Sequence, residues 1–163
     1  MIKPNKISES LVAEVMPLIE AEYDAFYHYR ALTNWCRGVG FNLAADFFEK
    51  ESQDELEHAK VLERYLVDWN VIVKLPVVES PKVSFADLVA GISDSYKMEY
   101  DLYQLYQKKV KKVFDMDVTL FGVLQERLEV QLKAVIEYSD KLNMLEGVDL
   151  NKTNLLLLES KLF

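Results

Sequence analysis

The sequence has 163 residues, half of them apolar, and a formal net charge of −8. A chain of this length can bury a core without disulfides or structural zinc, so we expect a single domain over residues 1–163. The acidic charge argues against nucleic acid as a partner, because phosphate binding needs clustered lysine and arginine. With five Gly and four Pro, the composition favours an all-α fold over a β-sandwich.

The compartment is expected to be the cytoplasm. Cys36 is the single cysteine and cannot form an internal disulfide, and residues 1–20 lack the features of a signal peptide. We expect Cys36 to be a small core residue. The longest apolar tracts, residues 71–73 and 155–158, fall far short of the roughly 20 residues that cross a bilayer, so no membrane partner is expected.

Helical periodicity predicts four long helices, at residues 8–37, 41–69, 84–114 and 117–146. The first is expected to begin after the cap-like Ser8 and to end at a short glycine-containing break, residues 38–40. Pro17 lies inside this block. The first helix therefore either starts nearer residue 14 or is kinked at the proline.

The connections between the helices define a topology. Residues 70–83 are too rich in proline and β-branched residues for a helix. Extended at about 3.3 Å per residue, a segment of about 14 residues reaches about 46 Å, which is enough to run the length of a helix of about 28 residues. Helices two and three can therefore be parallel, and a tight turn at residues 114–117 joins helices three and four. The chain thus predicts two antiparallel hairpins linked by a long crossover, with a short fifth helix near residues 155–163.

The predicted core carries polar residues near the middle of each helix. Side chains spaced alternately by four and three residues share one inward stripe, and most stripe positions here are apolar. The polar members are Glu22 on the first helix, Glu51, Glu55 and His58 on the second, Glu99 on the third and Gln131 on the fourth. Several buried carboxylates imply a compensating cation or protonation. Carboxylates and one imidazole, without thiolates, suit iron, manganese or zinc rather than copper.

Glu55 and His58 form a Glu-x-x-His pair, whose spacing places both side chains on one helix face. The pair is common by chance, but together with Glu22 and Glu99 on neighbouring stripes it predicts a metal site. We expect Glu55 to bridge two metal ions about 3.5 to 4 Å apart, the separation of two-metal sites. Glu22 and His58 then complete the coordination of one ion, and Glu99 with Gln131 completes the coordination of the other.

Three further residues near this site have open roles. Tyr29 lies on the stripe seven residues after Glu22 and is expected either to pack in the core or to donate to a ligand carboxylate or supply an electron. Glu51 is expected to have a hydrogen-bond or salt-bridge partner such as Arg30 rather than to bind metal. His28 lies off the stripe and is expected at the surface or at an interface.

These residues resemble the ferritin family, in particular its non-haem bacterial-type members, over nearly the whole chain. Residues 22–29 are similar to the family's first metal-binding helix, 44–59 to its second with the Glu-x-x-His-Ala ending, 96–99 to the third-helix ligand and 131–140 to the fourth helix with its glutamine. The resemblance implies a ferritin-like four-helix bundle, a di-iron ferroxidase centre with iron as the cofactor, and a homo-oligomeric shell of 24 subunits.

The same resemblance implies iron storage and detoxification, with Fe(II) oxidised by oxygen or hydrogen peroxide and deposited as ferric mineral. Its ferroxidase residues would be Glu22, Glu55, His58, Glu99, Gln131 and Tyr29. The predicted fourth helix has no histidine, so the doubled Glu-x-x-His site of bacterioferritins and many di-iron oxygenases cannot form. Bacterial ferritins often carry glutamates on the fourth helix for a third iron site. In this chain, Val130, Lys133 and Ala134 occupy those positions, so the resemblance does not imply a third site of that design. The alternative is a di-iron oxygenase or peroxidase that stores no iron.

Overall fold

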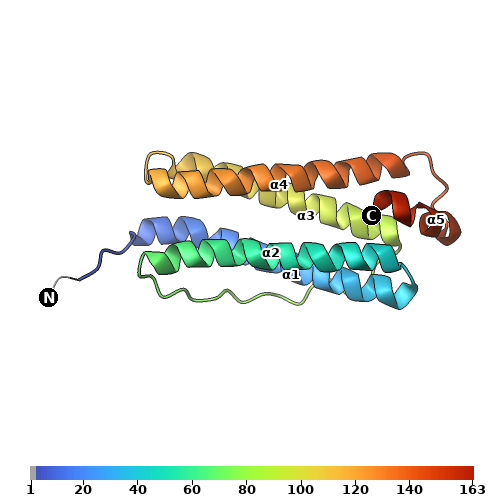
Figure 1. Cartoon of the computed structure of the whole chain (residues 1–163), viewed down its shortest axis with the longest axis horizontal. Helices are drawn as coiled ribbons and strands as arrows, with labels where there is room; N and C mark the ends of the chain where they lie inside the picture. The colour runs from blue at the N-terminus through green and yellow to red at the C-terminus, as the bar shows by residue number, and fades with distance from the viewer. Residues whose placement is uncertain (1–2) are drawn as a thin grey trace.

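The computed structural model describes residues 3–163, and over that range it contains five α-helices and no strand. The helices are α1 (Glu9–Val39), α2 (Asn42–Asp68), α3 (Leu88–Val113), α4 (Val118–Leu145) and α5 (Lys152–Leu162). Hairpin α1/α2 lies beside hairpin α3/α4 in one elongated bundle, and α5 sits at one end (Figure 1). The predicted all-α bundle with a short fifth helix is confirmed. None of the described helices combines the length and apolar character that a membrane span requires.

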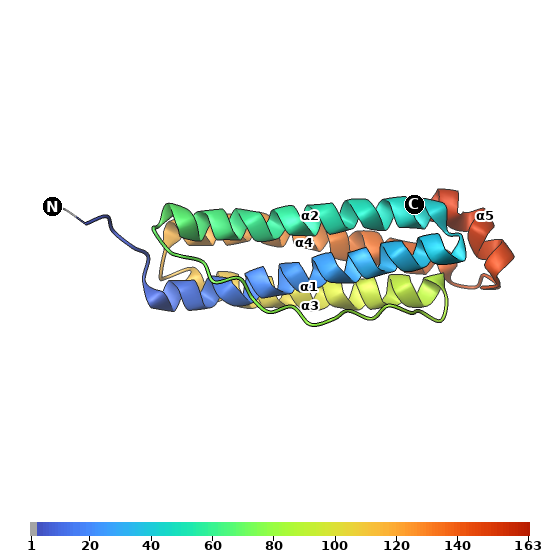
Figure 2. The same cartoon turned by 90° about the horizontal axis from the view of Figure 1, so that it is seen from below.

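The crossover between α2 and α3 is extended and runs the length of the bundle (Figure 2). It therefore returns the chain to the end of the bundle at which α2 began, and α2 and α3 point in the same direction. This is the arrangement that the length of the proline-rich segment predicted.

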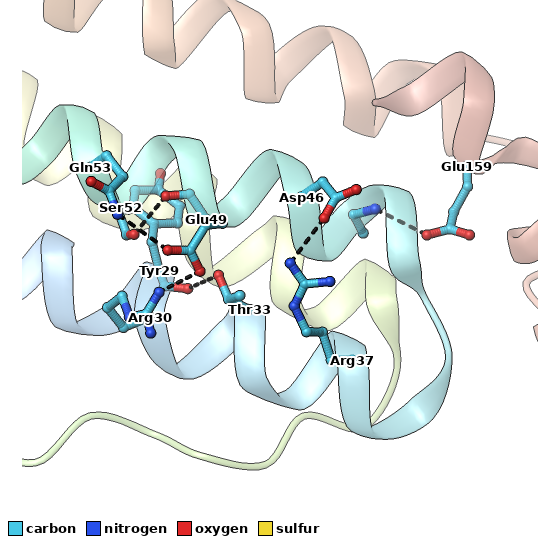
Figure 3. Close-up of polar contacts among 10 residues, drawn as sticks. Tyr29, Arg30, Thr33, Arg37, Asp46, Glu49, Ser52, Gln53 and Glu159 are labelled. Atoms are coloured by element: carbon cyan, nitrogen blue, oxygen red, sulfur yellow. Dashed lines mark hydrogen bonds and ion pairs between the residues drawn. The ribbon is translucent and has the colours of Figure 1, made fainter.

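Most helix starts are fixed by a side chain that accepts a backbone N–H of the first turn. The capping residues are Ser8 for α1, Asp87 for α3, Asp117 for α4 and Asn151 for α5. Helix α2 differs, because its N-cap Phe41 makes no side-chain cap. Instead, Glu159 Oε1 on α5 accepts the N–H of Ala44 at 3.0 Å (Figure 3).

The predicted helix boundaries need two corrections. Helix α1 begins at Glu9 and continues through Pro17, so the later start near residue 14 is wrong. It ends at Val39, and the φ of its C-cap Gly40, 94°, lies in the left-handed region that glycine tolerates. Helix α3 begins at Leu88 rather than at residue 84, because the Asp87 carboxylate caps it there.

The apolar core consists of two clusters separated by a polar layer. The first cluster includes Tyr29, Phe48 and Ile92, near the α5 end of the bundle. The second includes Leu18 and Leu62, toward the opposite end. Each of the four long helices carries between the two clusters a polar residue that the sequence predicted to face inward. These residues are Glu22, Glu55, Glu99 and Gln131. The bundle therefore encloses its polar residues at mid-length.

Candidate metal centre

The four long helices each place one polar side chain in this middle layer. They are Glu22 on α1, Glu55 on α2, Glu99 on α3 and Gln131 on α4, and all are at most 4% exposed. Their burial confirms the inward stripe predicted from helical spacing. On α4, Gln131 is buried in this layer, whereas Glu126 and Glu129 are exposed.

Hairpin α1/α2 brings three of the predicted ligands together. One ligand atom from each of Glu22, Glu55 and His58 lies within 4.8 Å of the others. His58 Nδ1 is 3.1 Å from Glu55 Oε2 and 3.7 Å from Glu22 Oε2. A half-buried imidazole and two buried carboxylates thus converge on one point.

Hairpin α3/α4 supplies the other side of the layer through Glu99. One oxygen of this carboxylate accepts the Tyr29 hydroxyl and the other accepts the Gln131 amide. The same amide nitrogen lies 3.0 Å from the Glu99 carbonyl oxygen. Tyr29 therefore donates to the predicted ligand carboxylate, one of the roles considered from the sequence.

Tyr106 also belongs to this layer, although the sequence analysis gave it no role. It is fully buried on α3 and donates to Glu22 Oε1. Tyr29 follows Glu22 by seven residues, and Tyr106 follows Glu99 by the same spacing. That repeated spacing was the signal in the sequence. Each tyrosine donates to the acid on the other hairpin, so the two hairpins orient each other's carboxylates.

The second oxygen of Glu22 is the clearest sign that the layer accommodates a cation. Glu22 Oε2 is buried and has no hydrogen-bond partner among the residues that the structure describes. An unpaired buried carboxylate oxygen is costly. A cation held between Glu22, Glu55 and His58 would satisfy it. Oxygen ligands with one imidazole nitrogen suit iron, manganese or zinc.

The carboxylates of the layer shift one another's pKa values. Burial raises the pKa of Glu55 well above its ordinary value, and the charges of Glu22 and Glu99 raise it further. Burial also raises the pKa of Glu99 to about 7, although hydrogen bonds from Tyr29 and Gln131 act in the opposite direction. Burial opposes ionisation of Glu22 as well, but interactions with His58 and Glu55 keep its pKa below the ordinary value. A divalent cation would remove the repulsion that keeps protons on this cluster.

Glu51 borders the layer and has a hydrogen-bond partner, as expected, but this partner is not Arg30. Arg30 forms its ion pair with Glu49, on the α1-facing side of α2 (Figure 3). Glu51 is half-buried and accepts the Tyr138 hydroxyl at 3.3 Å. Burial raises the pKa of Glu51 to about 7.

The remaining two candidates are structural. His28 is half-buried rather than at the surface, and its Nε2 lies 2.9 Å from Ser95 Oγ on α3. Burial lowers the pKa of His28 to about 4, so its imidazole is neutral at pH 7. Cys36 is a fully buried core residue, as expected, and burial raises the pKa of its thiol to about 12.

Comparison with known proteins gives a consistent family match. The family described as Ferritin-like domain matches residues 17–148. A bacterial non-heme ferritin of Staphylococcus epidermidis is 24% identical over 96% of this chain and 95% of its own length. A probable bacterial non-heme ferritin-like protein of Haemophilus influenzae is 26% identical over 85% of this chain and 87% of its own.

The fold has solved counterparts as well. A structure described as a novel open pore ferritin from the archaeon Archaeoglobus fulgidus superposes with a TM-score of 0.89. It is 23% identical, and the match covers 96% of each chain. An engineered closed form of the same archaeal protein superposes equally well, at 22% identity. At these identities the superpositions establish the shared architecture.

Proposed function

The chain belongs to the ferritin family, and from this membership we propose that it stores and detoxifies iron by oxidising Fe(II) at a di-iron ferroxidase centre in the middle of its bundle. The relatives named as bacterial non-heme ferritins support this proposal over nearly the full length of the chain. The observation that carries it is the convergence of Glu22, Glu55 and His58 around a buried carboxylate oxygen without a partner.

In the proposed centre, Fe(II) is the substrate and this chain supplies the ligand geometry. Glu55 lies between two ferrous ions, Glu22 and His58 hold one of them, and Glu99 with Gln131 holds the other. Two cations at such a site neutralise carboxylates whose burial and mutual repulsion raise the pKa of Glu55. The iron supplies the redox chemistry, with oxygen or hydrogen peroxide as the oxidant.

The surrounding residues orient the ligands and restrict water. The Tyr29 and Tyr106 hydroxyls fix the rotamers of Glu99 and Glu22 by donating to one oxygen of each. Hydrogen bonds of this kind to metal ligands commonly contribute 10- to 100-fold in affinity, as an order of magnitude. The two apolar clusters close the layer along the bundle axis. Entry of Fe(II) therefore displaces protons from a preformed site.

The proposed assembly is a cytoplasmic homo-oligomeric shell of 24 subunits, in which ferric product collects as mineral. Support comes from family membership and from the exposed apolar side chains of α5, where Leu157 is 72% exposed. A lone subunit would leave this surface in water.

The decisive experiment is aerobic addition of Fe(II) to the purified assembly, with ferric absorbance and particle size followed together. We expect a fast oxidation phase and a large particle that retains iron. The variant Glu55→Ala should lose the fast phase, because the proposed bridge is gone. Glu57→Ala is the matched control, since Glu57 is an exposed residue of the same helix.

Two results would contradict the proposal in different ways. A fast phase that survives Glu55→Ala would remove Glu55 from the centre. A small oligomer that turns over oxidant without accumulating iron would replace storage with a di-iron oxygenase or peroxidase activity.

A further inference from the structure

A second buried tyrosine lies beside Tyr29, farther from the proposed ligands. Tyr138 on α4 is fully buried, and its ring stacks on the Tyr29 ring with centroids 6.1 Å apart and planes 15° apart. The two aromatic systems are therefore adjacent and nearly parallel. No comparable ring contact is made by Tyr106 within residues 3–163.

Tyr138 also has its own carboxylate. Its hydroxyl donates to Glu51 Oε2 at 3.3 Å, just as Tyr29 donates to Glu99. Glu51 is half-buried, so a proton placed on it can be released to solvent. The pair Tyr138–Glu51 thus has the same hydrogen-bonding arrangement as the pair Tyr29–Glu99. It differs in that Glu51 is not a proposed metal ligand.

Burial restricts how such a phenol can be oxidised. It raises the pKa of Tyr138 well above the ordinary value, with Glu51 and Glu99 adding to the effect. A charged form of the ring is unfavourable in this environment. Loss of an electron must therefore be accompanied by loss of the phenolic proton, and Glu51 lies within hydrogen-bonding reach to accept it.

We propose that Tyr138 is a second redox-active residue, which passes an electron to oxidised Tyr29 while its phenolic proton moves to Glu51. This inference rests on the proposed ferroxidase function, whose dioxygen supplies the oxidant. Tyr138 is a positioning and relay residue, since it acts through Tyr29 and its hydroxyl donates to Glu51 rather than to a proposed iron ligand.

The electrons and protons balance as follows. Reduction of dioxygen to water takes four electrons, and two ferrous ions give two. Tyr29 gives a third by losing its electron to the reaction and its phenolic proton to Glu99. Tyr138 then gives one electron to the Tyr29 radical, which regains its proton from Glu99, and the Tyr138 proton passes to Glu51. Tyr29 then supplies the fourth electron, and its proton again passes to Glu99, while solvent supplies the protons of the water formed. Two later ferrous ions restore Tyr29 and Tyr138 as each ion becomes Fe(III), and the two phenols regain their protons from Glu99 and Glu51.

The test places 3-aminotyrosine at position 138 of the full-length assembly, since this analogue is oxidised more easily than tyrosine and traps the radical. Fe(II) and oxygen are mixed, frozen rapidly and examined by electron paramagnetic resonance. We expect an aminotyrosyl signal, and its loss when Tyr29→Phe blocks the relay. Glu51→Gln should slow its appearance by about 100-fold, the lower range for a positioned proton acceptor.

The matched control places the same analogue at Tyr100, which is 41% exposed on α3. No signal is expected there. A signal at position 138 that is unchanged by Tyr29→Phe would overturn the relay. So would absence of the signal while Fe(II) oxidation remains fast, and this outcome leaves the proposed function intact. Absence of fast Fe(II) oxidation in the unmodified protein would reject the function and the relay together.

A second readout separates redox chemistry from packing. Tyr138→Phe keeps the ring that stacks on Tyr29 and removes the oxidisable phenol. We expect this variant to release more hydrogen peroxide per dioxygen consumed, because fewer electrons are available locally, while its melting temperature stays near that of the unmodified protein. An unchanged peroxide yield would contradict the relay.

Discussion

At the scale of single residues, the tyrosine hydrogen bonds to two of the proposed ligands cross between the two hairpins. Tyr29 of α1 donates to Glu99 of α3, and Tyr106 of α3 donates to Glu22 of α1. Neither carboxylate is therefore oriented by its own helix. The ligand geometry exists only when the hairpins have packed together, which links formation of the centre to folding of the bundle.

The substitution Tyr106→Phe tests this orientation. It removes the donor to Glu22 and leaves both oxygens of that buried carboxylate without a hydrogen bond. We expect binding of a redox-inert divalent ion such as Zn(II) to weaken by about 10- to 100-fold, measured by calorimetry. Tyr103→Phe, a partly buried residue of the same helix, is the control. Equal affinity in the two variants would mean that the Tyr106 hydroxyl does not position Glu22.

The raised pKa of Glu99 predicts how the metal-free protein responds to pH. Burial raises this pKa to about 7 from an ordinary value of 4.5. Between these values the folded state binds more protons than the unfolded chain, so the free energy of unfolding falls as pH rises through the window. At about 1.4 kcal/mol per pKa unit, the loss is on the order of a few kcal/mol.

Thermal melting of metal-free protein between about pH 5 and about pH 8 measures this effect. The variant Glu99→Gln should reduce the dependence, since it removes one of the groups that titrate in this range, while Glu51, whose pKa is also raised to about 7, retains its share. Zn(II) should reduce it as well by favouring the carboxylate. A melting temperature that increases with pH across this range would contradict the prediction.

The sequence identified the buried polar residues of the middle layer but not all of their neighbours. Inward stripes place Glu22, Glu55, Glu99 and Gln131 correctly, because helical spacing alone decides which side chains face the core. The same spacing could not choose between Glu49 and Glu51 as the partner of Arg30. That choice depends on the rotation of α2 against α1, which only the packed structure fixes.

At the scale of the helices, α5 completes the start of α2. The sequence predicted the Ser8 cap, since a capping side chain is a local signal. It could not predict the cap of α2, because Glu159 follows Ala44 by 115 positions. Lys141 of α4 fixes the other end of α5 by donating to the Leu162 carbonyl at 2.7 Å. The fifth helix is therefore part of the bundle.

The substitution Glu159→Ala should destabilise the subunit, because it leaves a buried N–H of α2 unpaired. Loss of a helix cap typically lowers the free energy of unfolding by about 1–2 kcal/mol. Chemical denaturation monitored by circular dichroism measures the change. Lys161→Ala, at an exposed position of the same helix, should have little effect. If both variants unfold alike, the contact between Glu159 and Ala44 contributes no stability.

At the scale of the whole molecule, two apolar clusters support a polar layer that would otherwise be unfavourable. The layer lies at mid-length, between the two clusters. The sequence predicted the hairpins and the crossover because segment length and composition determine them. It gave no direct measure of how subunits meet, since such contacts depend on surface shape.

The exposed end of α5 gives a test of assembly that is separate from oxidation. Leu156 and Leu157 are 40% and 72% exposed, next to the buried Leu155. Burying a leucine fully stabilises an interface by about 1.5–3 kcal/mol, and a shell repeats each contact many times. We therefore expect Leu157→Glu to shift the assembly to smaller species in light scattering, with the fast phase of Fe(II) oxidation retained. Leu157→Met should assemble normally, and an intact shell in Leu157→Glu would place the subunit contacts elsewhere.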